Sequence, residues 1–178
     1  RIGPLTSGTA ALLIADQVHW SFANPPPAAL LLVACLHALF GRKRAQGGFR
    51  EWDSNTYFEE DVLALSHLAD LAENDEVREL ATVVLDKLLF NLAVNSYQGV
   101  FGSTHGRSYA PYLKGGHLEP TSGISRLLWG KGIFNDRILG LVSLACAVGY
   151  LLPPVIEAIA LDPAEEIWSR ERHAGTLE

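Results

Sequence analysis

The segment 75–97 constrains the fold most strongly, because apolar residues recur along it at helical spacing and cover most of its surface. A helix that is apolar on most sides is usually covered by neighbours on more than one side. We therefore predict a long core helix in a domain built from several helices. Its polar stripe is narrow and consists of Asp75, Glu79, Thr82 and Asp86.

Two further apolar segments with helical spacing lie near the beginning of the chain, at 9–22 and 28–40. The run Asn-Pro-Pro-Pro at 24–27 separates them, because prolines cannot continue a helix. Gly41 ends the second segment. These two segments predict a helical hairpin.

A helix start is also predicted at Thr56, where Thr56 and Glu59 have the spacing of a capping box. In that motif the threonine side chain caps the helix and the glutamate reaches back to the threonine amide. The apolar pattern continues to about Glu73. We predict that this helix pairs with the segment 75–97 in antiparallel fashion.

The second half of the chain begins with a glycine-rich polar stretch at 98–120, which predicts a long irregular loop. Loops of more than about 12–15 residues are uncommon in compact domains and are often functional. Short helices are predicted over 122–129, from an Asn135 cap to about 149, and after Pro153 to 161, with another helix start at 162–165.

No segment shows the strict alternation of a half-buried strand, so we predict an all-α fold of antiparallel helical hairpins. Such hairpins build α/α barrels, solenoids or bundles, and the absence of a fixed repeat period argues against a solenoid. We expect residues 1–178 to form a single helical domain. Because the sequence has no methionine and opens on Arg1, we expect it to be a processed chain or a piece of a larger protein.

Composition excludes several classes of function. With 48% hydrophobic and 19% charged residues, the chain is globular, and its net charge of −6 is unusual for a nucleic-acid-binding domain. The apolar runs 28–40 and 138–152 fall short of the roughly 20 residues that a membrane span requires. Cys35 and Cys146 lie in apolar runs and are predicted to be buried. We expect no metal, cofactor, nucleic-acid partner or membrane span.

Polar and aromatic side chains gather in two stretches, 51–57 and 95–109. One precedes a predicted helix and the other follows its predicted partner. If the two helices are antiparallel, the two stretches meet at one rim of the domain. Trp52, beside this rim, is a candidate for stacking on a sugar ring, and Tyr57, Glu51 and Asp53 are candidates for substrate binding.

His105, Arg107 and Tyr109 alternate along the second stretch, which points their side chains the same way in an extended loop. Histidine is a base near neutral pH, arginine binds carboxylates in bidentate fashion, and tyrosine can transfer a proton. Asn55 adds a neutral donor. Together these four residues suit β-elimination on a uronic-acid polymer, with Arg107 and Asn55 stabilising the charge that develops on the carboxylate.

Two other interpretations stay open. Arg107 could pair with Glu51, Asp53 or Glu119 and only pin the loop, which would make the chain a non-catalytic scaffold or interaction module. A glycosidase would instead use two carboxylates, one as acid and one as base or nucleophile. The rim offers Glu51, Asp53, Glu59, Asp61 and Glu119 for that purpose.

The motifs Ser54-Asn55-Thr56-Tyr57, Gly99-Val100-Phe101-Gly102 and Gly106-Arg107-Ser108-Tyr109 resemble segments of large bacterial proteins. Those proteins are similar to the α/α-toroid group that includes polysaccharide lyases and six-hairpin glycosidases. The resemblance covers roughly residues 51–129. A complete toroid needs about six hairpins and this chain supplies about three or four, so the resemblance implies either an incomplete barrel or a helical-hairpin module alone.

In the lyases of that group an Asn, a His, a Tyr and an Arg form the active site. The resemblance therefore implies catalytic roles for Asn55, His105, Arg107 and Tyr109, with Tyr57 as the alternative tyrosine. The expected activity is cleavage of a uronic-acid-containing polysaccharide or oligosaccharide, and the alternatives are a six-hairpin glycoside hydrolase or a non-catalytic helical module.

Overall fold

A computed structural model describes residues 53–102, 107, 109–162, 165–168 and 170. Most of the described residues are helical, which confirms the all-α prediction. The helices expected at 9–22 and 28–40 lie outside the described residues, and so do Cys35, Glu51, Trp52 and His105.

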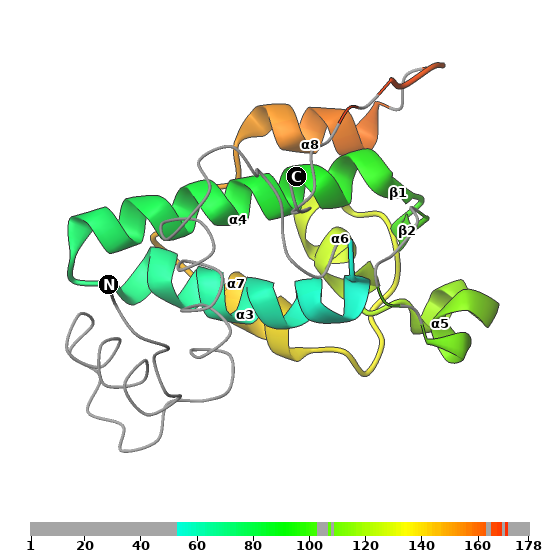
Figure 1. The fold of residues 1–178 in the computed structure, drawn as a ribbon, viewed down its shortest axis with the longest axis horizontal. Helices are drawn as coiled ribbons and strands as arrows, with labels where there is room; N and C mark the ends of the chain where they lie inside the picture. The colour runs from blue at the N-terminus through cyan, green and yellow to red at the C-terminus, as the bar shows by residue number, and fades with distance from the viewer. Residues whose placement is uncertain (1–52, 103–106, 108, 163–164, 169, 171–178) are drawn as a thin grey trace, which may run out of the picture.

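Two long helices, α3 (Asn55–Leu71) and α4 (Asp75–Asn95), lie side by side and run in opposite directions (Figure 1). Asn74 separates them and caps α4, because its side chain accepts a hydrogen bond from the Val77 amide at 3.1 Å. Asp75 and Glu76 in the first turn of α4 favour this start through the helix dipole.

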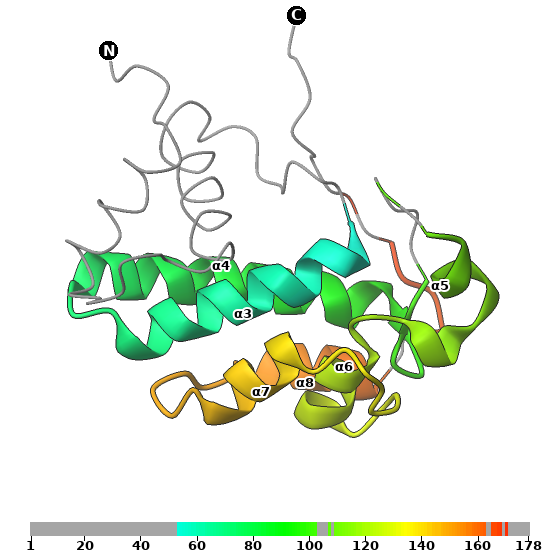
Figure 2. The same cartoon turned by 90° about the horizontal axis from the view of Figure 1, so that it is seen from below.

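A second group of helices covers one side of this pair: α6 (Ser122–Trp129), α7 (Leu139–Cys146) and α8 (Pro154–Leu161) (Figure 2). Helix α7 packs against α3, and α8 packs against α4. As predicted, α4 is a core helix, since four of its leucines are fully buried between these layers: Leu85, Leu88, Leu89 and Leu92.

The capping box predicted at Thr56 is wrong. Helix α3 begins at Asn55 with Ser54 as its N-cap, and Thr56 lies inside the first turn. The Glu59 carboxylate accepts a hydrogen bond from the Leu139 amide at 3.2 Å. A contact with α7 has therefore replaced the local one that the spacing predicted.

The stretch 98–120 is more ordered than predicted. Strands β1 (Ser96–Tyr97) and β2 (Val100–Phe101) form an antiparallel hairpin, so α4 ends two residues earlier than expected. The turn residues Gln98 and Gly99 both have positive φ, as a tight two-residue turn requires. A short helix α5 (Ala110–Lys114) and a 3-10 turn η1 (Gly116–Leu118) follow.

Three predictions near the end of the chain also need correction. Helix α7 starts at Leu139 rather than after Asn135, and the side-chain nitrogen of Asn135 instead donates to the carbonyls of His117 and Glu119. Cys146 is exposed rather than buried. The residues 165–168 are not helical, so the start signal at 162–165 is not followed by a helix there.

Across the described residues, none of the helices has the length and apolar character needed to cross a membrane.

Candidate functional site

The beginning of α3 lies beside the end of α4, so the two polar stretches adjoin. The Asn91 side chain donates to Oδ1 of Asp53 at 2.8 Å, across the two helices. Phe58 and Phe101 pack edge to face with ring centroids 5.7 Å apart. In both views of the ribbon, α5 and the β hairpin lie at this same end (Figures 1 and 2).

Arg107 and Tyr57 join the loop to α3. Nη1 of Arg107 donates to the Tyr57 hydroxyl oxygen at 2.7 Å, and the guanidinium carbon lies 5.2 Å from the centre of the tyrosine ring. This combines a hydrogen bond with a cation–π contact. Arg107 is exposed and Tyr57 is half-buried, so this contact lies at the surface of the protein.

Tyr109 and Tyr112 continue the same surface toward α7. Tyr109 precedes α5 with 42% of its surface exposed, and its ring meets that of Tyr112 edge to face at 6.0 Å. The Tyr112 hydroxyl in turn accepts a hydrogen bond from Nη2 of Arg137, whose guanidinium carbon lies 5.6 Å from the ring centre. We call this set the tyrosine–arginine rim: Tyr57, Arg107, Tyr109, Tyr112 and Arg137.

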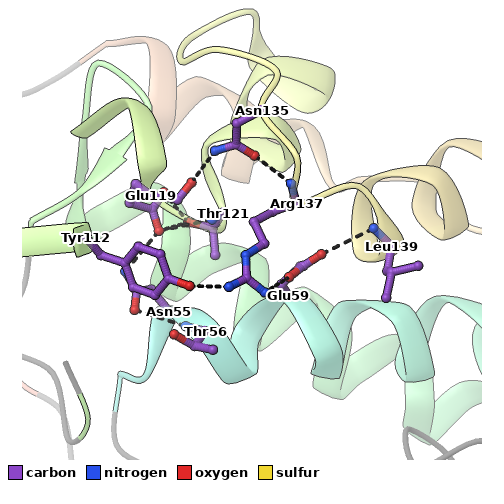
Figure 3. Close-up of polar contacts among 9 residues, drawn as sticks. All are labelled: Asn55, Thr56, Glu59, Tyr112, Glu119, Thr121, Asn135, Arg137 and Leu139. Carbon is purple, nitrogen blue, oxygen red and sulfur yellow. Dashed lines mark hydrogen bonds and ion pairs between the residues drawn. The ribbon is translucent and has the colours of Figure 1, made fainter. Parts of the chain in front are cut away.

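Below the rim, Glu119 is the centre of a buried hydrogen-bond network (Figure 3). Its Oε1 accepts from Nδ2 of Asn55 at 3.1 Å and from the Thr121 amide at 3.0 Å, and the Thr121 hydroxyl lies 2.8 Å from Oε2. Burial raises the pKa of Glu119, although the hydrogen bonds from Thr121 and Asn55 oppose this. Asn55 is therefore turned inward, with only 1% of its surface exposed.

Glu59 is a second buried carboxyl group, on α3 beside the start of α7. Burial raises its pKa, whereas Arg137 and the amides of Leu139 and Gly140 oppose the shift. Oε2 of Glu59 lies 3.9 Å from Nη1 of Arg137, which makes a loose ion pair. The pair connects α3 to the residues that precede α7.

The raised pKa values of Glu119 and Glu59 predict that the stability of the protein depends on pH, and Glu119 shows the sign. The folded-state pKa of Glu119 lies above its ordinary value of 4.5, so the folded protein binds more protons than the unfolded chain between the two pKa values. The free energy of unfolding therefore falls as pH rises through this window, by at most about 1.4 kcal/mol per pH unit for this one group.

The prediction is checked by comparing wild type with Glu119→Gln in denaturant titrations from pH 4 upward. The stability of the wild type relative to the variant should decrease as pH rises above about 4.5 and then level off. If the stability of the wild type relative to the variant stays constant or increases with pH, the pKa of Glu119 is not raised in the folded protein.

The carboxylates proposed for glycoside hydrolysis face inward. Asp53, Glu59, Asp61 and Glu119 all have 6% or less of their surface exposed. Hydrolysis requires two carboxyl groups that flank the scissile bond and reach the substrate. The side chains of Glu119 and Glu59 do not reach the surface, and their hydrogen bonds connect separate elements of the fold.

A serine–histidine contact elsewhere in the fold is structural. Ser143 Oγ on α7 lies 2.9 Å from Nδ1 of His67 on α3, as in a nucleophile–base pair. However, Nδ1 also lies 2.7 Å from the Leu63 carbonyl oxygen, so this nitrogen must carry the proton that it donates there. A nitrogen that already carries a proton cannot accept one from Ser143, and the contact ties α7 to α3.

Three of the residues predicted for the site lie outside the described residues, namely His105, Glu51 and Trp52, and their roles stay predictions. The structure brings Tyr57, Arg107 and Tyr109 to the rim and places Asn55 and Asp53 beneath it. Sequence reasoning missed Tyr112 and Arg137, because no local motif marks either residue. Within the described residues, no group of three or more His, Cys, Asp or Glu side chains could hold a metal ion.

Comparison of the chain with protein-family models, curated proteins and solved structures gives no match.

Proposed function

We propose that the tyrosine–arginine rim binds an anionic polysaccharide, and that the chain belongs to a polysaccharide lyase that cleaves uronic-acid-containing glycans by β-elimination. The observation that supports this most is the contact between Arg107 and Tyr57. It places an exposed guanidinium, which binds carboxylates, on the oxygen of a phenol, which can transfer a proton.

Three of the five rim residues, Arg107, Tyr109 and Tyr57, have a chemical task in this proposal. Arg107 binds the C6 carboxylate of the uronic acid and stabilises the negative charge that develops as the C5 proton leaves. A base removes that proton, and Tyr109 and the sequence-predicted His105 are the candidates. The C4–O bond breaks, a C4=C5 double bond forms, and the Tyr57 hydroxyl donates its proton to the departing oxygen.

The local charge also favours an anionic ligand, although the whole chain carries a net charge of −6. The segment 96–137, which supplies most of the rim, contains five Arg or Lys residues and only two acidic residues. One of those acids, Glu119, is buried. The beginning of α3, at the same end, adds the acidic residues Asp53, Glu59, Glu60 and Asp61, of which only Glu60 is exposed. The exposed charge at this end is therefore more basic than acidic, which suits a polyanion.

Exposed aromatic rings supply the second half of glycan recognition. Tyr109 and Tyr97 are 42% and 74% exposed, and both lie at the end where the two polar stretches adjoin. Aromatic rings offer large apolar surfaces on which the faces of sugars can stack. By contrast, the glycoside hydrolase alternative has weaker support, because its candidate carboxylates in the described residues are buried.

We also propose that these helices form part of an incomplete α/α ring within a larger chain. Helices α7 and α8 bury one side against α3 and α4, yet Leu139, Val142 and Val155 remain more than half exposed. Exposed apolar patches often mark an interface with another structural element, and Leu139 and Val142 lie one helical turn apart on α7. Further helical hairpins of the same protein would cover them.

The activity test compares wild type with Arg107→Ala and Arg107→Lys on a panel of uronic-acid polymers. Elimination creates a conjugated uronate that absorbs at roughly 235 nm, so the rate can be followed continuously. We expect Arg107→Ala to lower kcat/KM by about 10²–10³-fold, because a donor to the developing charge is lost. Lysine should recover only part of the activity, because it cannot bind in bidentate fashion.

Arg126→Ala is the matched control, since Arg126 is also an exposed arginine but donates to the Gly130 carbonyl in the last turn of α6. Its kcat/KM should stay within about twofold of wild type. Unchanged turnover of Arg107→Ala with a wild-type melting temperature would refute the proposal.

A further inference from the structure

We infer that Arg137 is a second carboxylate-binding residue of the rim, so that the preferred glycan carries acidic groups on neighbouring sugars. The inference rests on the proposed function and names its substrate class more closely. Arg137 precedes α7 and is distant in sequence from the stretches 51–57 and 95–109. Its contact with Tyr112 is what brings it to the same surface.

Arg137 is accessible at the surface, whereas its partner Glu59 is not. The Arg137 side chain retains 39% of its accessible surface, whereas that of Glu59 retains 5%. Their closest atoms are 3.9 Å apart, too far for a hydrogen bond, and Glu59 instead accepts one from the Leu139 amide. Arginines that serve as counter-ions of carboxylates frequently form close bidentate hydrogen bonds, which Arg137 and Glu59 do not.

Tyr112 and Asn135 hold Arg137 in place. The Tyr112 hydroxyl accepts from Nη2 (Figure 3), and the guanidinium carbon lies 5.6 Å from the centre of the tyrosine ring. The Asn135 side chain accepts from the Arg137 amide at 3.0 Å and donates to the Glu119 carbonyl at 2.9 Å. A guanidinium that is already oriented loses little further freedom when it binds a carboxylate.

The rim thus contains the same unit twice: Arg107 with Tyr57, and Arg137 with Tyr112. In each unit a guanidinium N–H donates to the phenol oxygen, and the guanidinium carbon lies 5.2 Å or 5.6 Å from the ring centre. Tyr109 links the units, since it is two residues from Arg107 and packs against Tyr112. Two guanidinium groups held by tyrosines that are linked in this way suit a ligand with repeated carboxylates.

The test uses two polymers as probes: one of uronic acid at every sugar, and one in which uronic acid alternates with a neutral sugar. Wild type should prefer the first. Arg137→Gln should raise KM for the first polymer by about tenfold or more, because a charge-assisted hydrogen bond is lost, and should raise it much less for the second. Arg137→Lys should restore part of the preference.

Three results are distinguishable. If wild type cleaves neither polymer, the proposed function itself fails. The inference is overturned if wild type cleaves both polymers without preference. It is also overturned if Arg137→Gln changes KM for both polymers equally or for neither, because Arg137 then does not bind a second carboxylate. A rise in KM confined to the fully acidic polymer supports it.

A loss of stability in Arg137→Gln could obscure the comparison, because Glu59 would lose its counter-charge. The double variant Glu59→Gln/Arg137→Gln removes both charges and keeps the side-chain volumes. Its melting temperature should return toward that of wild type while its KM for the fully acidic polymer stays high. If its KM instead returns to the wild-type value, the effect of Arg137 is structural and the inference is overturned.

Discussion

Glu119→Ala should lower the free energy of unfolding by about 3–5 kcal/mol, the largest effect that we expect from a single polar residue. The substitution removes both oxygens that accept hydrogen bonds from Asn55 and Thr121 and leaves those donors buried without partners. Each such orphaned group costs about 1–3 kcal/mol, and the truncated side chain adds a cavity.

Glu119→Gln is the matched control, because its amide oxygen can still accept from Asn55 and Thr121 while its nitrogen donates to the Thr121 hydroxyl. Its stability at pH 7 should lie within about 1 kcal/mol of wild type. Urea denaturation of both variants measures the difference. If alanine and glutamine variants are equally stable, the Glu119 network does not hold the start of α3 to the Thr121 segment.

Gly99→Ala should be the most damaging substitution of a glycine in the β hairpin, with an expected loss of about 3–5 kcal/mol. Gly99 has a φ of +80°, and a Cβ atom there would lie 2.3 Å from the Cα and amide nitrogen of Gly132. Both of those are backbone atoms, so neither can rotate away. The hairpin and the segment before α7 would have to separate.

Gly130→Ala separates the two causes of this loss. Gly130 also has a positive φ, of +73°, but a Cβ atom at that position meets nothing within 4 Å. It should therefore cost only the strain of the left-handed backbone, about 1–2 kcal/mol. Thermal melts of both variants provide the comparison, and equal losses would show that the contact between Gly99 and Gly132 is not tight in solution.

Elements that depend on local periodicity were predictable from the sequence. The bounds of α6 and α8 agree with the expected helices at 122–129 and after Pro153, and α4 has the expected position as a core helix. Elements that depend on distant contacts were not. The Glu59 carboxylate accepts a hydrogen bond from the Leu139 amide, 80 residues away, and does not form a capping box. The buried contact with α7 competes with the local one.

The candidate site shows the same division. The meeting of Arg107 with Tyr57 follows from the antiparallel pairing of α3 and α4, which the sequence indicated. The burial of Asn55 does not follow, because its partner Glu119 is 64 residues away. Arg137 could not be identified either, since only the fold brings it to Tyr112.

The most direct test of the central proposal is the mass of the products released when the 178-residue chain acts on a defined oligomer of uronic acid. β-Elimination adds no atoms, so the masses of the two products should sum to that of the substrate, and one product should carry a C4=C5 double bond. Products whose masses sum to the substrate plus one water would identify a hydrolase, and an intact oligomer would show no cleavage. Either result would contradict the assignment of the tyrosine–arginine rim to a polysaccharide lyase.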